Sequence, residues 1–341
     1  MKALTPGRFV VRIFPFVIFF AAAMIFCPMI GRVPVDFSRA FDPAIPREIN
    51  SDYTLLFVLR FPRLLLAALT GSALAMAGAA FQALLRNPLA EPYTLGVSSG
   101  AALGAVLAIK LGLDISLFGF SSVPLFAFIG SLAAMGLIYL LARGAGGLPG
   151  SILLLAGVTI SFFFSSMILF IHYLADFTEN HQMIRWMMGG LDIVGYKSLT
   201  SVLPLWAIGV AALIYLSSDL NVLSFGATMA SAKGVDVPRT QKATFLFASM
   251  ITGAVVSAAG PIGFVGLIVP HALRFITGPD MRILVPACAF AGAGFLALCD
   301  TAARTIHPSV EIPVGVLTAM IGGPFFLLLL LRHKKRWSER D

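Results

Sequence analysis

The chain has 341 residues, of which 58% are hydrophobic and only 12% are charged. Soluble domains carry roughly a quarter charged residues, so this composition excludes a soluble protein and indicates one integrated membrane domain over residues 1–341. The formal net charge is +8. Because the basic residues stand in short clusters between apolar runs, without a basic stripe, they indicate membrane orientation rather than nucleic-acid binding.

Apolar runs that approach or exceed the length of a bilayer-spanning helix recur along the whole chain. They cover residues 13–31, 64–85, 93–109, 122–142, 151–173, 199–216, 243–260, 262–275, 283–299 and 312–331. We therefore expect an all-α protein with ten transmembrane helices. The positive-inside rule places both termini, and most of the lysines and arginines, in the cytoplasm.

The cysteines and histidines give no sign of a metal site or of catalysis. Cys27, Cys288 and Cys299 stand in apolar surroundings without the Cys-x-x-Cys or Cys/His spacing of a zinc site, and they read as buried free thiols. The histidines have no ligand spacing, and no nucleophile motif is present. We expect no metal, no cofactor and no enzymatic activity.

The ten predicted spans contain no Asp, Glu, Lys or Arg in their interiors. A charge at the bilayer centre costs about 2.5–3.5 kcal/mol on insertion scales, and carriers that couple to ions retain one because it functions. The sequence also lacks the phosphate-binding loop G-x-x-x-x-G-K-[ST], so ATP-driven transport would need a separate ATPase. An ion-coupled secondary transporter or a channel remains the alternative, with a membrane-embedded enzyme behind it.

Residues 217–242 form the longest predicted cytoplasmic connection, and they are more apolar than a solvated linker requires. Gly226 and Gly234 divide the segment. We expect one or two short helices that present apolar surface to another protein. The alternative is a loop folded back on its own helix ends.

Four ordered motifs carry a resemblance that covers about residues 55–332. They are R-F-P-R at 60–63, R-N-P-L-A-E-P at 86–92 followed by L-G-V-S-S-G at 95–100, G-P-I-G-F-V-G-L-I-V-P-H at 260–271, and E-I-P-V-G at 311–315. With them the chain resembles a FecCD-type permease subunit of a binding-protein-dependent ABC importer for vitamin B12, haem or ferric siderophores.

The resemblance implies a multi-pass homodimer in the bacterial cytoplasmic (inner) membrane, with the translocation path between the subunits. It also implies two cytoplasmic ATPase subunits and an extracytoplasmic substrate-binding protein. Acidic residues of that protein would meet Arg60, Arg63 and Arg304, since a guanidinium binds carboxylates in pairs. The residues alone allow another reading, in which these arginines anchor at the interface or bond helix-end carbonyls.

The resemblance also assigns the ATPase-coupling and path residues. The coupling residues would be Asn221, Leu223, Phe225, Gly226, Met229 and Gly234. Ala227 and Ser231 stand where family members usually carry an acidic residue and an arginine, and Met281 replaces a common histidine. The fifth and tenth spans would line the path with Thr159, Ser161, Ser165 and Thr318, although such hydroxyls also bond their own helix carbonyls. The chelate itself is left open.

Overall fold

The computed structural model describes residues 6–117, 120–143, 148–191, 193–307 and 309–338. Ten of its helices correspond to the predicted apolar runs. They are α1 (Pro6–Phe26), α4 (Phe61–Leu85), α5 (Val97–Lys110), α6 (Ser122–Ala142), α7 (Gly150–Leu174), α9 (Lys197–Leu223), α11 (Val237–Ala259), α12 (Val265–Thr277), α13 (Met281–Thr305) and α14 (Val314–Ser338). The described residues contain no β-strand, which confirms the all-α prediction.

Seven helices in the described residues are long and apolar enough to cross a bilayer. The apolar parts of α5, α12 and α14 are shorter, at 10–17 residues. In α12 the shortness follows from the G-P-I-G-F segment, which separates it from α11. The number of ten crossings therefore stays a prediction.

Helix α4 is the centre of the bundle. Its most apolar window is 89% buried, against 28% for α6 and 33% for α7, and it packs against α9, α11, α12 and α13. The contact with α13 needs small residues, because a Cβ added at Gly71 would lie 2.1 Å from the carbonyl oxygen of Gly292. In lipid the hydrophobic effect does not drive helices together, so van der Waals contact between closely approaching backbones stabilises such pairs instead.

The helical segment that contains α4 begins earlier than the predicted start at residue 64. It continues from α3 (Ser51–Tyr53) through a π-helical stretch at Thr54–Arg60, and the side chain of Asn50 caps its first turn. Pro62 cannot donate a backbone hydrogen bond. The nearby carbonyl of Val58 accepts one from the amide of Gly195 at 2.9 Å instead. Arg60 and Arg63 therefore lie within a helix rather than ahead of one.

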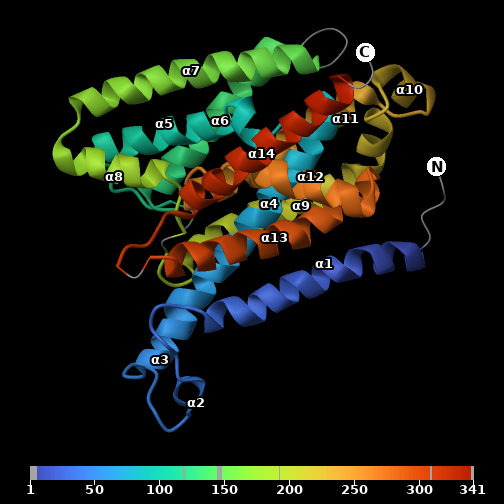
Figure 1. Cartoon of the computed structure of the whole chain (residues 1–341). Helices are drawn as coiled ribbons and strands as arrows, with labels where there is room; N and C mark the ends of the chain where they lie inside the picture. The colour runs from blue at the N-terminus through green and yellow to red at the C-terminus, as the bar shows by residue number, and fades with distance from the viewer. Residues whose placement is uncertain (1–5, 118–119, 144–147, 192, 308, 339–341) are drawn as a thin grey trace.

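Besides α3, three short α-helices in the described residues lie outside the apolar runs. Helices α2 (Phe37–Ala40) and α8 (Phe177–Met187) were not predicted, and α10 (Ala227–Ala232) is one of the short helices expected within 217–242. Helix α10 lies at the same end of the bundle as the start of α1 and the far end of α14, whereas α2, α3 and α8 lie at the opposite end (Figure 1).

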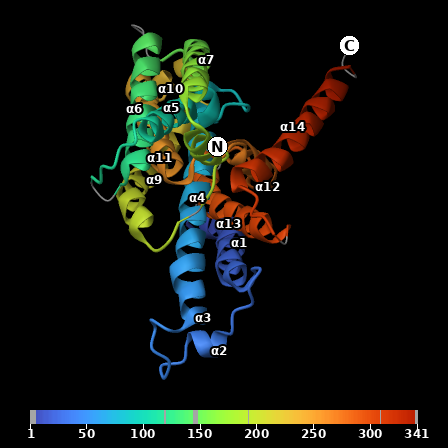
Figure 2. The same cartoon turned by 90° about the vertical axis from the view of Figure 1, so that its left-hand side faces the viewer.

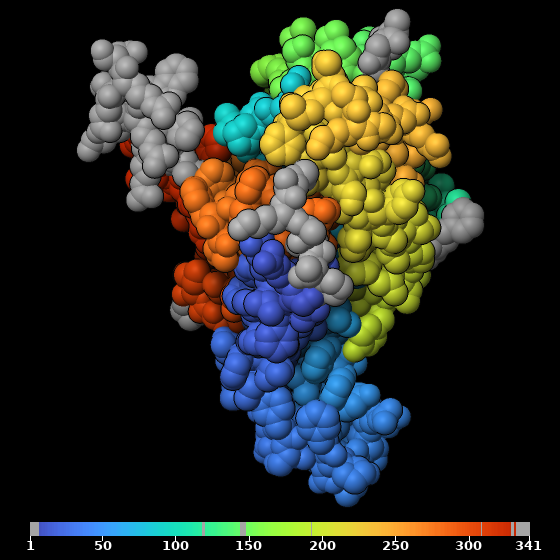
Figure 3. Space-filling model, turned by 90° about the vertical axis from the view of Figure 1, so that its right-hand side faces the viewer, coloured from blue at the N-terminus to red at the C-terminus, as the bar shows by residue number. Residues whose placement is uncertain are grey.

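Two surfaces of the bundle matter for function. Helix α14 projects away from the rest of the molecule along much of its length (Figure 2). At the α10 end, the segment that joins α9 to α11 lies on the surface in amber (Figure 3).

The three cysteines are buried and unpaired, as the sequence predicts.

Candidate functional sites

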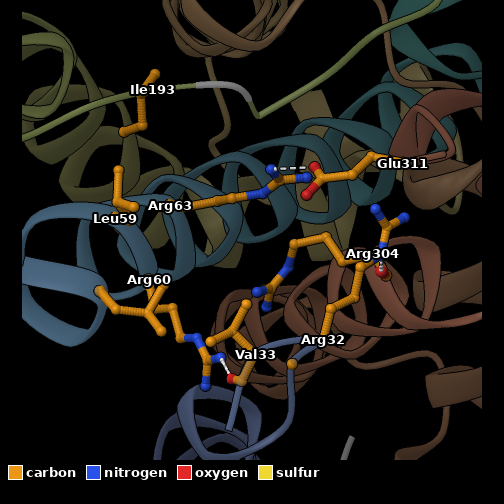
Figure 4. A pocket seen from close by; sticks show the side chains of 10 residues that line it. Arg32, Val33, Leu59, Arg60, Arg63, Ile193, Arg304 and Glu311 are labelled. Atoms are coloured by element: carbon orange, nitrogen blue, oxygen red, sulfur yellow. Dashed lines mark hydrogen bonds and ion pairs between the residues drawn. The ribbon is translucent and has the colours of Figure 1, made fainter. Parts of the chain in front are cut away.

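The structure brings the three predicted docking arginines together around one pocket of about 300 Å³. Arg60 and Arg63 come from the start of α4, and Arg304 comes from the last turn of α13 (Figure 4). Arg32 and Glu311 also line this pocket. We call these five residues, together with Asp300 beneath them, the arginine cluster. It lies at the α2–α3 end of the molecule.

Arg60 is committed to the backbone of the segment that follows α1. It is only 5% exposed, its Nη1 donates to the carbonyl of Pro28 at 2.7 Å, and its Nη2 donates to the carbonyl of Val33. This is the carbonyl-bonding role that the residues alone allowed. Arg60 therefore holds the 28–33 segment against the start of α4.

Arg63 divides its guanidinium between two carboxylates. Its Nε and Nη2 lie 3.0 Å and 2.9 Å from Oδ1 of Asp300, and its Nη1 lies 2.8 Å from Oε2 of Glu311. Arg304 Nε adds a hydrogen bond to Asp300 Oδ2 at 3.1 Å. The Asp300 side chain is 1% exposed, so two guanidiniums compensate one buried carboxylate.

The sequence reasoning did not assign three members of this cluster. Asp300 precedes Arg304 by four residues on α13, which is the spacing of a helical ion pair and was a usable signal. Glu311 stands inside one of the four motifs. Arg32 gave no sequence signal, yet its Nε donates to the carbonyl of Arg304 at 2.7 Å while the residue stays exposed.

The six predicted coupling residues divide into three roles. Phe225 and Met229 are 62% and 52% exposed and form an apolar surface at α10. Gly226 and Gly234 adopt positive φ angles of 120° and 82°, which suit the turns that bound α10. Leu223 is buried, and so is Asn221, whose Oδ1 accepts a hydrogen bond from the amide of Met281 at 3.0 Å.

The three positions at which this chain differs from the family's usual residues also divide into exposed and buried ones. Ala227 and Ser231 are exposed on α10, so the surface around Phe225 and Met229 carries small side chains where family members usually carry charged ones. Met281 is 2% exposed and begins α13, where its amide meets Asn221. Asn221 thus fixes the end of α9 to the start of α13 beneath the apolar surface.

The four predicted path residues do not share one environment. Thr159 and Ser165 lie on an exposed face of α7, and Thr159 bonds the carbonyl of Leu155 at 2.9 Å. Ser161 is half-buried, 3.2 Å from the hydroxyl of Ser99. Thr318 is fully buried and bonds the carbonyl of Gly315 at 3.0 Å. Within this chain three of these four hydroxyls are thus hydrogen-bonded.

A second pocket, of about 570 Å³, lies between α8, α12 and the start of α14. Met188, Phe264 and Met320 contribute apolar walls, and Glu91 contributes a carboxylate. Glu91 is 8% exposed although it belongs to the polar R-N-P-L-A-E-P motif between two predicted spans. The absence of charge within the apolar runs therefore did not mean the absence of a buried carboxylate between them.

An all-helical bundle that joins a cationic pocket at one end to an exposed apolar surface at the other is typical of a transport permease that contacts separate proteins. The model of the FecCD transport family matches residues 18–332, and the chain belongs to this family. Its members found here include permease proteins of ABC importers.

Three relatives show the extent of the similarity. The chain is 42% identical to the cobalamin import system permease protein BtuC of Halobacterium salinarum, over 82% of this chain and 73% of that protein. It is 39% identical to the hemin transport system permease protein HmuU of Yersinia pestis, over 82% and 84%. An inward-facing transporter assigned to the metal-chelate ABC type superposes with a TM-score of 0.82 at 28% identity, over 94% of this chain and 98% of that one.

Proposed function

We propose that the chain is the membrane-spanning subunit of a binding-protein-dependent ABC importer that moves a metal chelate into a bacterial cytoplasm. One observation carries this proposal: the arginine cluster and the apolar α10 surface lie at opposite ends of the bundle. A permease between a receptor outside and an ATPase inside needs two such surfaces. The relatives support a chelate such as cobalamin, haem or a ferric siderophore.

In this proposal both termini and α10 face the cytoplasm, and ten helices cross the membrane. Two copies of the chain enclose the path between α7 and α14. One face of α7 is free to contact a partner copy, since Phe162 and Tyr173 on this helix are 73% and 86% exposed. The projection of α14 away from the body leaves a further face for that copy (Figure 2).

Energy would come from separate ATPase subunits that bind the α10 surface. Phe225 and Met229 supply the apolar contact, and Asn221 transmits movement of α10 to the start of α13 through its bond to Met281. Because Ala227 and Ser231 are uncharged, this contact would depend on shape and apolar area more than on ion pairs.

The test is transport by the reconstituted complex. The chain would be expressed with the ATPase and binding protein encoded with it, placed in liposomes, and offered radiolabelled cyanocobalamin, haem or ferric hydroxamate. We expect uptake of one of these that requires both ATP and the binding protein. Uptake by this chain alone, driven by an ion gradient without ATP, would overturn the proposal in favour of a secondary carrier.

A further inference from the structure

In the arginine cluster, the ion pair between Arg63 and Glu311 has an accessible carboxylate. We propose that Glu311 occupies, on Arg63, the place that a carboxylate of a docking protein takes, and that this exchange releases the segment leading into α14. The inference rests on the proposed function for its partner, which is a protein that presents an aspartate or glutamate side chain to the pocket.

The two carboxylates on Arg63 differ in how easily they can be replaced. The Asp300 side chain is 1% exposed and is bound by two arginines, so removing it would leave buried charge uncompensated. The Glu311 side chain is 46% exposed. The Arg63 side chain is 13% exposed, so only the Glu311 carboxylate is well solvated by water when the pair opens. Release of a half-exposed carboxylate costs less than release of a buried one. A competing carboxylate can therefore displace Glu311 but not Asp300.

The charge balance of the cluster favours a further anion. Four arginines face two carboxylates, Asp300 and Glu311, which leaves two positive charges in excess. Arg32 is the accessible one: it is exposed, and within the described residues its two terminal nitrogens bind no other group. A carboxylate that enters beside Arg32 would reach the Nη1 of Arg63 from the same pocket (Figure 4).

Glu311 also lies close to the start of α14. It stands three residues before Val314, the first residue of α14, and the backbone between them is held by a hydrogen bond of 3.3 Å from Ile312 N to the carbonyl of Ala303. The next anchor is the amide of Gly315, 3.1 Å from the carbonyl of Gly189. Loss of the Glu311 pair would thus remove one of the few bonds that hold this junction. Docking at the cluster would then loosen the start of α14, the helix proposed to line the path.

The plain alternative is that Glu311 is only a structural tether that takes no part in docking. The two hypotheses predict different changes in binding-protein affinity when Glu311 is removed. If Glu311 competes with a partner carboxylate, its removal strengthens docking. If it only orders the pocket, its removal weakens docking or leaves it unchanged.

The test compares Glu311→Gln with Glu48→Gln in the full reconstituted complex. Glu48 is exposed at the same end of the molecule and, within the described residues, has no hydrogen-bond or ion-pair partner, so the control removes the same charge without touching Arg63. We expect E311Q to bind the complex's own binding protein about two- to fivefold more tightly than E48Q. Without binding protein, E311Q should show faster amide exchange at residues 309–312 and faster ATP hydrolysis.

Equal or weaker binding of E311Q relative to E48Q overturns the exchange, and so does unchanged amide exchange at 309–312. A third variant, Arg32→Gln, should weaken binding while leaving the amide exchange of that segment unaltered. If the wild-type complex binds no binding protein at all, the proposed function itself fails. Wild-type binding with no difference between E311Q and E48Q removes only the exchange.

Discussion

Arg63 Nη2 lies 2.9 Å from Oδ1 of Asp300, which joins the start of α4 to the end of α13 across 237 residues of sequence. This pair closes the bundle at its α2–α3 end, because α4 is the central helix and α13 packs along it. The cluster around it is therefore both a structural joint and the proposed receptor surface.

The first prediction separates these two roles. Asp300→Asn should destabilise the protein by roughly 3–5 kcal/mol, because it leaves Arg63 and Arg304 without a buried counter-charge. Glu311→Gln should cost less, about 1 kcal/mol, since the Glu311 carboxylate is half-exposed and Asp300 still neutralises Arg63. Thermal unfolding in detergent, monitored by size-exclusion chromatography, measures which of the two variants loses more stability. Equal losses for both variants would contradict the division of Arg63 between a fixed and a replaceable carboxylate.

The second prediction concerns the apolar surface at α10. Replacing Phe225 and Met229 together with alanine should reduce co-purification of the ATPase and lower ATP hydrolysis, because these side chains are 62% and 52% exposed and carry the proposed contact. Leu111→Ala is the control, since Leu111 is 63% exposed but ends α5 at the opposite end. A similar effect of the control on ATPase binding would argue against a local docking surface.

The third prediction tests the contact of α12 with α14. A Cβ at Gly322 would lie 2.2 Å from Cγ of Phe264, so Gly322→Ala should destabilise the protein by about 1–3 kcal/mol. In a Phe264→Ala background the same substitution should cost much less, and the difference gives the coupling energy. Gly136→Ala serves as the control, because a Cβ there meets nothing within 4 Å. Additive effects of the two substitutions would show that Phe264 and Gly322 are not in contact.

The fourth prediction concerns pH. Lys110 Nζ lies 2.8 Å from Oε2 of Glu179, and this hydrogen bond lowers the pKa of the Glu179 carboxyl below its ordinary value. A lowered pKa means that the stabilisation is complete above the unfolded value of about 4.3 and is lost as the pH falls through the folded value. The difference in unfolding temperature between wild type and Lys110→Met should therefore be largest at pH 6–7 and shrink as the pH falls below the unfolded value of about 4.3. The hydrogen bond from Lys110 Nζ to the carbonyl of Leu174 at 2.8 Å is lost at every pH and leaves a constant remainder. A difference that stays constant across this range would exclude the ion pair as its cause.

Much of the fold could be predicted because the hydrophobicity of each apolar run by itself indicates a membrane helix. The ten runs all contain a helix, and their bounds differ mainly at the ends, where α4 continues back through residues 51–60 and α9 continues to Leu223. The amphipathic helix α8 was missed because its sequence is not apolar enough to register as a span. Its capping residue Asp176, which accepts from the amide of Glu179 at 2.8 Å, was the available signal.

The candidate sites could be predicted only in part. The family resemblance placed Arg60, Arg63 and Arg304 in one group, and the structure brings them to one pocket. Their different roles could not be predicted, since burial of Arg60 on the carbonyls of Pro28 and Val33 depends on how the segment after α1 returns to α4. The burial of Glu91 could not be predicted either, because a polar motif between two apolar runs gives no sign of being folded into the bundle.

The sequence by itself determined that this protein is a helical membrane permease, because hydrophobic transfer is summed over each local run of residues and the motifs mark the family. Only the tertiary structure decided which charges are paired and which remain free. Pairing depends on distances between residues hundreds of positions apart, such as Arg63 with Asp300 and Glu311. Those distances are set by helix packing at small residues such as Gly71 and Gly292, not by any local preference of the chain.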